Sequence, residues 1–109
     1  PEWKYNGDIE GYVLEEQLDG TIPLYEYYHD EAFDHYTTTL TNIHIAYKGW
    51  LRLRIAGYIY KEPKMETTIL YDYGANSVCD HYTSDDPYVC QNWPDWKILN
   101  ISGYVYPSD

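Results

Sequence analysis

The stretch Leu24-Tyr25-Glu26-Tyr27, followed by Asp34-His35-Tyr36-Thr37, decides the fold because it occurs twice. It returns as Leu70-Tyr71-Asp72-Tyr73 and Asp80-His81-Tyr82-Thr83, at an offset of 70 − 24 = 46 residues. A repeat of this length is typical of chains built from similar units that bury their apolar faces against each other. We therefore expect one domain made of two repeated units.

A second pattern has the same period and adds a partial copy. It starts at a Trp and ends in a Gly-Tyr strand, and it occupies residues 3–14, 50–60 and 96–106. Gly11, Gly57 and Gly103 are equivalent positions. We assign residues 1–19 to a partial repeat, residues 20–65 to the first unit and residues 66–109 to the second unit.

Each unit reads as strand, strand, short helix, strand. Alternating side chains predict strands at 21–28, 34–38 and 50–60 and at the equivalent positions of the second unit. Ser84-Asp85-Asp86-Pro87 signals a helix start, so we expect a short helix at about 86–92. Residues 39–48 fit either a helix or a strand. The expected class is mainly β, a β-rich α+β fold, with Gly74-Ala75-Asn76-Ser77 as the second hairpin loop and residues 3–14 as one N-terminal strand.

The Gly-Tyr strands carry a repeated aliphatic face that predicts the core. In the first unit we expect Leu53, Ile55 and Ile59 to face inward and Arg52, Arg54, Tyr58 and Tyr60 to face outward. The equivalent inward residues are Ile9 and Val13 in the partial repeat and Ile101 and Val105 in the second unit.

Charge and composition exclude several functions. The chain has 7 basic and 18 acidic residues, a net charge of −11, which disfavours nucleic acid and anionic membranes as partners. No apolar run is long enough to cross a bilayer, so we expect no membrane insertion. Of the 20 aromatic residues 15 are Tyr, a residue suited to sites where one end of the ring is dry and the other polar.

Cys79 and Cys90 are the two cysteines of a short, Tyr-rich chain. This usage favours a disulfide in an oxidising compartment, and therefore a secreted, extracellular protein, over two free buried thiols. Because the partial repeat has no hairpin of its own, its strand either completes a layer of the second unit or packs against a partner chain. The latter makes a homodimer an expectation.

The repeated motifs resemble a secreted repeat family of unknown function, often appended to extracellular hydrolases. The similar segments are Pro23 to Tyr28, Asp34 to Thr37 and Arg54 to Tyr58, with their second-unit equivalents Leu70 to Tyr73, Asp80 to Thr83 and Asn100 to Tyr104. The resemblance implies an extracellular accessory module that binds carbohydrate or cell-wall material, with no catalytic residues. The chain departs from the family pattern in carrying acids where the family has Arg.

His35 and His81 invite a catalytic interpretation, since each follows an acid and precedes a hydroxyl residue by two positions. Strand geometry opposes it, because neighbouring side chains project to opposite faces and form no local triad. We expect these residues to be structural or to line ligand sites, and we expect no enzyme, although a small hydrolase stays as a third class.

The outward Tyr face is the predicted glycan site, because Tyr and Trp rings stack on sugars while polar groups bind hydroxyls. An alternative is that these rings form a second small core. The candidate ligand-binding residues are Tyr12, Tyr58, Tyr104, Arg52, Arg54, Asn100, His35, His81, Asp34, Asp80, Trp50 and Trp96. Repeated weak sites would gain apparent affinity by multivalency.

These features predict a secreted lectin-like protein that binds glycans or glycoproteins and needs no cofactor. Calcium is conceivable through Asp30, Glu31 and Asp34, although a solvated acidic surface explains them better. The competing hypothesis is an acidic, Tyr-rich extracellular matrix protein that binds Ca²⁺ or mineral.

Overall fold

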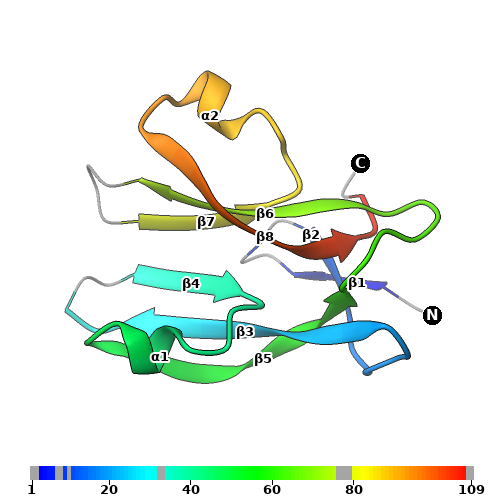
Figure 1. Ribbon diagram of the computed structural model, residues 1–109, viewed down its shortest axis with the longest axis horizontal. Helices are drawn as coiled ribbons and strands as arrows, with labels where there is room; N and C mark the ends of the chain where they lie inside the picture. The colour runs from blue at the N-terminus through cyan, green and yellow to red at the C-terminus, as the bar shows by residue number, and fades with distance from the viewer. Residues whose placement is uncertain (1–2, 7–8, 10, 32–33, 76–79, 108–109) are drawn as a thin grey trace.

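The computed structural model describes residues 3–6, 9, 11–31, 34–75 and 80–107. They form a curled antiparallel sheet of eight strands with two one-turn helices, so the expected mainly-β class is confirmed (Figure 1). The two ends of the chain's described part lie on the same side of the molecule in Figure 1.

Both units have the expected order of elements. In the first unit the elements are β3 (Thr21–His29), β4 (Asp34–Thr38), α1 (Ile43–Ala46) and β5 (Trp50–Tyr60). In the second unit they are β6 (Thr68–Ala75), β7 (Asp80–Ser84), α2 (Val89–Asn92) and β8 (Trp96–Val105). The ambiguous segment 39–48 thus contains a helix. The helix expected at 86–92 begins three residues later, after the turn made by Asp86.

The N-terminal segment differs from the expected single strand. It forms a hairpin of β1 (Trp3–Asn6) and β2 (Gly11–Leu14), in which Trp3 lies opposite Leu14 and Asn6 opposite Gly11. The chain reverses between Asn6 and Gly11, so the turn signal expected at Asn6-Gly7 falls inside the segment and the strand expected over 3–14 is divided in two. Residues 7, 8 and 10 lie outside the described residues.

One end of the sheet holds the aliphatic core cluster, to which the partial repeat and both units contribute equally. The hairpin of β1 with β2, and the pairs of β3 with β5 and β6 with β8, meet there through β2, β5 and β8. Each part supplies two buried aliphatic side chains to one cluster: Ile9 and Val13, Leu24 and Ile59, Leu70 and Val105. The partial repeat therefore adds to the core from within the chain, but its strand β2 pairs with β5 of the first unit and not, as one of the two alternatives expected, with the second unit.

Two of the equivalent glycines allow the close approach of these strands. A Cβ at Gly103 would stand 2.5 Å from the carbonyl oxygen of Tyr60, and one at Gly57 would stand 2.6 Å from Cγ2 of Val13. At Gly11 the nearest atom would be Cδ1 of Ile9 at 3.6 Å, an ordinary contact. The Gly-Tyr motif is thus a packing device between consecutive units.

The other end of the sheet splits into two arms. We call residues 25–55 the first arm and residues 71–101 the second arm; each contains a three-stranded sheet and one helix. The arms lie against each other with β4 beside β7 (Figure 1). Side chains join them; for example, the Thr83 hydroxyl donates to the carbonyl oxygen of Thr37 at 2.5 Å.

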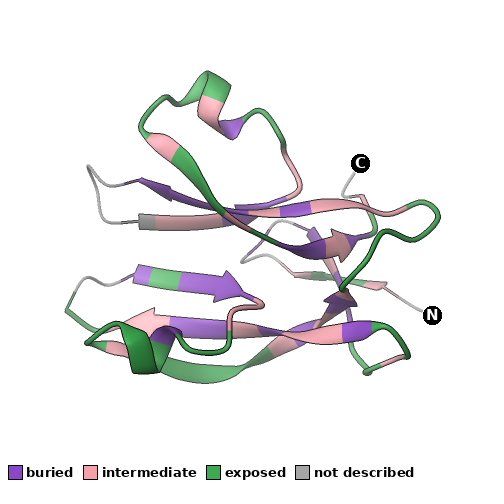
Figure 2. Ribbon diagram, in the orientation of Figure 1, coloured by how far each residue is buried: buried purple, intermediate pink, exposed green. Residues whose placement is uncertain are grey.

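The prediction of which side chains of β5 and β8 point inward is wrong within the arms. Tyr25 pairs with Ile55 and Leu24 with Gly57, so Ala56 is passed over, and Leu53 is passed over in the same way. Each β-bulge inverts the alternation of side chains. Leu53 and Ile55 are therefore about half exposed, as is Ile101 of the second unit, whereas Ile9, Val13, Ile59 and Val105 are buried as expected. Figure 2 shows the exposed stretches of β5 and β8 in green.

Two other expectations concern the second hairpin. Gly74 and Ala75 belong to β6 and pair with His81 and Asp80, so they are not part of the loop. The rest of that loop and Cys79 lie outside the described residues, and the expected Cys79–Cys90 disulfide stays a prediction. Cys90 is partly buried on α2 and forms no disulfide with a described residue.

Candidate functional site

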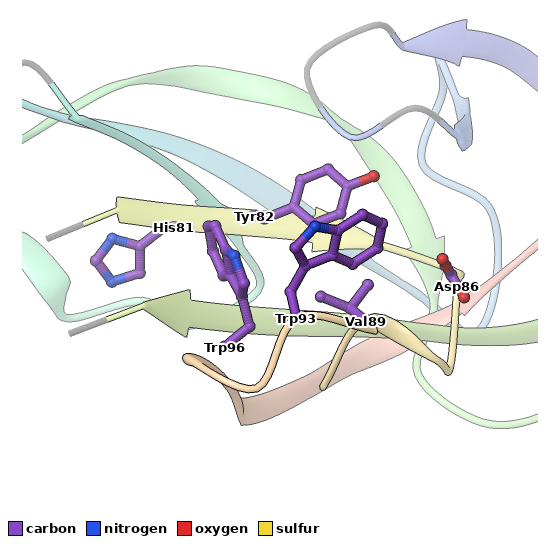
Figure 3. A pocket seen from close by; sticks show the side chains of 6 residues that line it. All are labelled: His81, Tyr82, Asp86, Val89, Trp93 and Trp96. Atoms are coloured by element: carbon purple, nitrogen blue, oxygen red, sulfur yellow. The ribbon is translucent and has the colours of Figure 1, made fainter. Parts of the chain in front are cut away.

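A pocket of about 360 Å³ opens in the second arm between β7, α2 and the start of β8 (Figure 3). Its walls carry three large aromatic side chains and two polar ones. The lining residues are His81, Tyr82, Asp86, Val89, Trp93 and Trp96. In Figure 3 His81 lies at one end of the pocket and Asp86 at the other, with Trp96, Tyr82 and Trp93 between them.

The turn before α2 fixes the Asp86 end of the pocket. The Asp86 amide donates to the Ser84 hydroxyl at 3.1 Å, and the Asp86 carboxylate accepts the Tyr88 amide at 2.9 Å. The Tyr73 hydroxyl donates to the Asp86 carbonyl oxygen at 2.5 Å. These bonds hold the carboxylate on a tight Asx-type turn beside the aromatic walls.

The aromatic walls follow from the repeat. The Tyr82 and Trp96 rings meet edge to face at 6.0 Å and 67°, and their first-unit equivalents Tyr36 and Trp50 meet at 6.3 Å and the same angle. Val89 forms a buried floor, and Trp93, 56% exposed, stands at the mouth. Such a pocket offers flat apolar walls with polar groups at its ends.

The equivalent place in the first arm is packed differently. Leu40 is the first-unit equivalent of Asp86. The Tyr27 hydroxyl donates to the Leu40 carbonyl oxygen at 2.6 Å, as the equivalent Tyr73 hydroxyl donates to the Asp86 carbonyl oxygen. Leu40 packs against the cluster of Tyr27, Tyr36 and Ile43. The two units therefore share a frame but differ in the polarity of this place.

His81 is shared between the arms. Its ring stacks on Tyr36 at 4.2 Å and meets Trp50 edge to face at 5.2 Å. Its Nδ1 lies 2.5 Å from Oδ2 of Asp34, and its amide donates to Oδ1 of the same carboxylate at 3.2 Å. The surroundings of His81 on this side are those of a contact between units, in line with a structural role.

A buried polar cluster lies between the arms around Asp72, which is fully buried. Its Oδ2 accepts the hydroxyls of Tyr36 at 2.9 Å and Thr38 at 2.5 Å and the amide of Asn100 at 3.2 Å. Its Oδ1 accepts the Ser102 hydroxyl at 2.6 Å. Desolvation raises the pKa of Asp72 despite these donors, and burial followed by the nearby Asp72 charge raises the pKa of Tyr36.

The structure separates the sequence-predicted site residues into groups. Tyr12, Tyr58 and Tyr104 are partly exposed at the core end, each next to a buried Val13, Ile59 or Val105. Tyr12 contacts the rings of Tyr5 and Tyr106. This group lies outside the pocket in the second arm.

The polar members of the predicted set already have intramolecular contacts. Arg54 pairs with the carboxylate of Glu26 at 2.9 Å, and Asn100 donates to Asp72. Arg52 donates to the Thr41 carbonyl oxygen at 2.7 Å and covers the Tyr25 ring. These contacts hold Arg52, Arg54 and Asn100 within the arms.

Of the predicted residues, His81 and Trp96 line the pocket, whereas Asp34 and Trp50 contact His81 from the first arm. His35 is 56% exposed on β4, with its Nδ1 3.5 Å from Glu26. The side chain of Asp80 lies outside the described residues. The prediction missed Tyr82, Asp86, Val89 and Trp93. Comparing the units position by position would have flagged Asp86 and Trp93, where the first unit has Leu40 and Tyr47.

Among the described residues, no group of three or more His, Cys, Asp or Glu side chains is placed to hold a metal ion. Nor does any helix of these residues have the length and apolar character needed to span a bilayer.

Comparison with known proteins gives no match to a family model, a curated protein or a solved structure. The resemblance to a secreted repeat family therefore stays a prediction.

Proposed function

We propose that the chain is a secreted, lectin-like protein that binds glycans without catalysis, and that the second-arm pocket is its site. The observation that carries the proposal is the pocket wall, in which Tyr82, Trp93 and Trp96 stand between the polar side chains of His81 and Asp86. This site replaces the outward Tyr face as the leading candidate.

A sugar ring has the complementary chemistry. Its C–H faces are apolar and flat enough to stack on an indole, and its hydroxyls donate to a carboxylate or an imidazole nitrogen. Trp93 is exposed at the mouth, so a stacked sugar would remove apolar ring surface from water. Asp86 stands on a turn that is already ordered, so little conformational entropy would be lost when it binds a hydroxyl.

The difference between the units supports one such site per chain. Leu40 gives the equivalent place in the first arm no charged group, and it packs into a cluster with Ile43 and Tyr36. Multivalent binding would then require more than one copy of the chain.

A glycan array on the purified chain, followed by calorimetry with the best ligand, tests the proposal. Trp93→Ala should weaken binding by about tenfold or more, since an exposed stacking aromatic commonly supplies that much. Tyr47→Ala is the matched control, because Tyr47 is the exposed first-unit equivalent and should have no effect on binding. Both variants should keep the thermal stability of the parent.

Tyr58→Ala separates the two candidate sites. Loss of glycan binding in Tyr58→Ala, with Trp93→Ala unchanged, would move the site to the outward Tyr face. An array without any bound glycan, together with tight binding of Ca²⁺ or mineral, would reject the lectin proposal in favour of a matrix protein.

A further inference from the structure

The segment that walls the second-arm pocket is negatively charged, and its first-arm equivalent is not. Residues 84–96 run from the end of β7 through α2 to the start of β8, and they supply four of the six described lining residues. They contain three acids and no Lys or Arg, a formal charge of −3. The equivalent residues 38–50 contain no acid and one base, Lys48, a formal charge of +1. The acids are Asp85, Asp86 and Asp95.

No side chain of the described pocket lining balances this charge. Of the six, only His81 can become cationic, and the Asp34 carboxylate already lies 2.5 Å from its Nδ1. Lys97 is the one Lys or Arg in the sequence of the second arm. It follows Trp96 in β8, so its side chain projects to the opposite face of the strand. The pocket therefore attracts a cationic ligand and repels an anionic sugar.

The Asp86 carboxylate is placed to receive a positive group. It is half-buried, and its Oδ1 accepts the Tyr88 amide. Its Oδ2 forms no hydrogen bond or ion pair with any residue that the structure describes. In Figure 3 the Trp93 indole lies between Trp96 and Asp86, so a ligand on this ring is next to the carboxylate.

An aromatic face beside a carboxylate is suited to an ammonium group. The carboxylate accepts a charge-assisted hydrogen bond from it, and the ring attracts the positive charge through its negative face. The first arm shows such a cation–ring contact within the chain, where the Arg52 guanidinium lies 4.2 Å from the centre of the Tyr25 ring.

We propose that the glycan bound in this pocket carries a free, protonated amino group, as in sugars of the glucosamine type that are not N-acetylated. This inference rests on the proposed glycan-binding function and names its ligand class. The ammonium group donates to Oδ2 of Asp86, and the sugar ring that bears it stacks on Trp93. N-acetylation removes the charge and therefore this selectivity.

Calorimetry at about pH 6, well below the pKa of an amine, compares three trisaccharides of the same linkage. They are the trimers of glucosamine, N-acetylglucosamine and glucose, which differ at one ring substituent. The glucosamine trimer should bind at least about tenfold more tightly than the other two at low salt. This difference should shrink as salt rises, since salt screens the attraction between charges, while stacking of the neutral trimers changes little.

Asp86→Asn isolates the charge. The amide oxygen of the new side chain can still accept the Tyr88 amide, so the turn is kept while the charge is lost. This variant should lose most of the preference for glucosamine and keep its affinity for the glucose trimer. Glu16→Gln is the matched control, since it removes the same charge from an exposed position and should keep the preference. Circular dichroism confirms that both variants are folded.

Equal binding of the three trimers, weakened by Trp93→Ala, overturns the amine proposal and leaves the glycan proposal standing. A preference for glucosamine that neither Asp86→Asn nor Trp93→Ala reduces is attraction to the acidic surface as a whole, and it also overturns the amine proposal. Binding of none of the three trimers overturns it as well, while the glycan array decides the glycan proposal independently.

Discussion

The buried carboxyl of Asp72 should make the stability of the fold depend on pH in an unusual direction. Two effects compete at this group: complete burial favours the neutral acid, and four hydrogen-bond donors favour the carboxylate. Burial is the larger effect, because the pKa of Asp72 is raised in the folded state. Its contribution to stability is therefore fully present below the pKa of the unfolded chain, about 3.9, and is lost as pH rises through the folded pKa.

The substitution Asp72→Asn isolates this effect. Between the unfolded and folded pKa values, each pH unit should lower the free energy of unfolding of the parent by up to about 1.4 kcal/mol. The side-chain amide that the substitution introduces does not ionise, so this loss disappears in the variant. The substitution also replaces an acceptor oxygen by a donor beside the Asn100 amide, which costs about 1 kcal/mol at every pH.

Urea unfolding followed by tryptophan fluorescence, from about pH 3 to about pH 8, measures the difference between parent and variant. The other carboxyl groups are common to both proteins and cancel. The stability of Asp72→Asn relative to the parent should rise with pH above about 4. Glu16→Gln removes the same charge from the exposed surface and controls for net charge.

A difference that is constant with pH, or that falls as pH rises, would refute the reasoning. A constant difference would mean that the donors from Tyr36, Thr38, Asn100 and Ser102 balance the effect of burial, and a difference that falls would mean that they outweigh it. A difference that Glu16→Gln reproduces would belong to net charge and not to Asp72.

Three further predictions test the packing of the units. Gly103→Ala should lower the free energy of unfolding by about 1–3 kcal/mol because its Cβ would meet the Tyr60 carbonyl oxygen, while the matched Gly11→Ala should be neutral or slightly stabilising in the same urea assay. The pKa of Tyr36 is raised in the fold, so the unfolded chain loses the hydroxyl proton at lower pH and the free energy of unfolding should fall above about pH 10. The free energy of unfolding of Tyr36→Phe should fall less steeply in alkaline titration followed by circular dichroism. His81→Ala should destabilise the fold by about 1–3 kcal/mol and His81→Phe by less in thermal unfolding, since Phe keeps the stacking on Tyr36 although it loses the Asp34 bond; equal losses would show that stacking contributes little.

The order of elements could be predicted from the sequence because the repeat gives every assignment a second test. The helix signal at Ser84-Asp85-Asp86-Pro87 is clear, and it resolves the ambiguous segment 39–48 by equivalence. The core residues Val13, Ile59 and Val105 follow from simple alternation near the glycines.

The exposed faces of β5 and β8 could not be predicted, since alternation holds only within an unbroken ladder. The bulges at Leu53 and Ala56 depend on how β3 pairs with β5, which a local pattern does not contain. Nor does alternation reveal a hairpin within 3–14, where the chain turns between two short strands.

The similarity between the two units makes the fold predictable from the sequence, but it does not indicate where the pocket lies. The repeat predicts the same role for equivalent residues such as His35 and His81, although one is exposed and the other lies between the arms. The residues that distinguish the pocket, Asp86 and Trp93, are those at which the units differ. Function in a repeat protein of this kind is better sought in the differences between its copies.

The contrast between Glu26 and Asp72 limits how such a chain can be duplicated or shuffled. These two acids occupy equivalent positions, but Glu26 faces Arg54 and His35 while Asp72 is enclosed by hydroxyls from both units. A tandem of two first units would place a longer acid and a guanidinium where Asp72 and Asn100 now fit beside Tyr36 and Thr38. The copies have therefore become a matched, ordered pair, and neither can replace the other without rebuilding the junction between them.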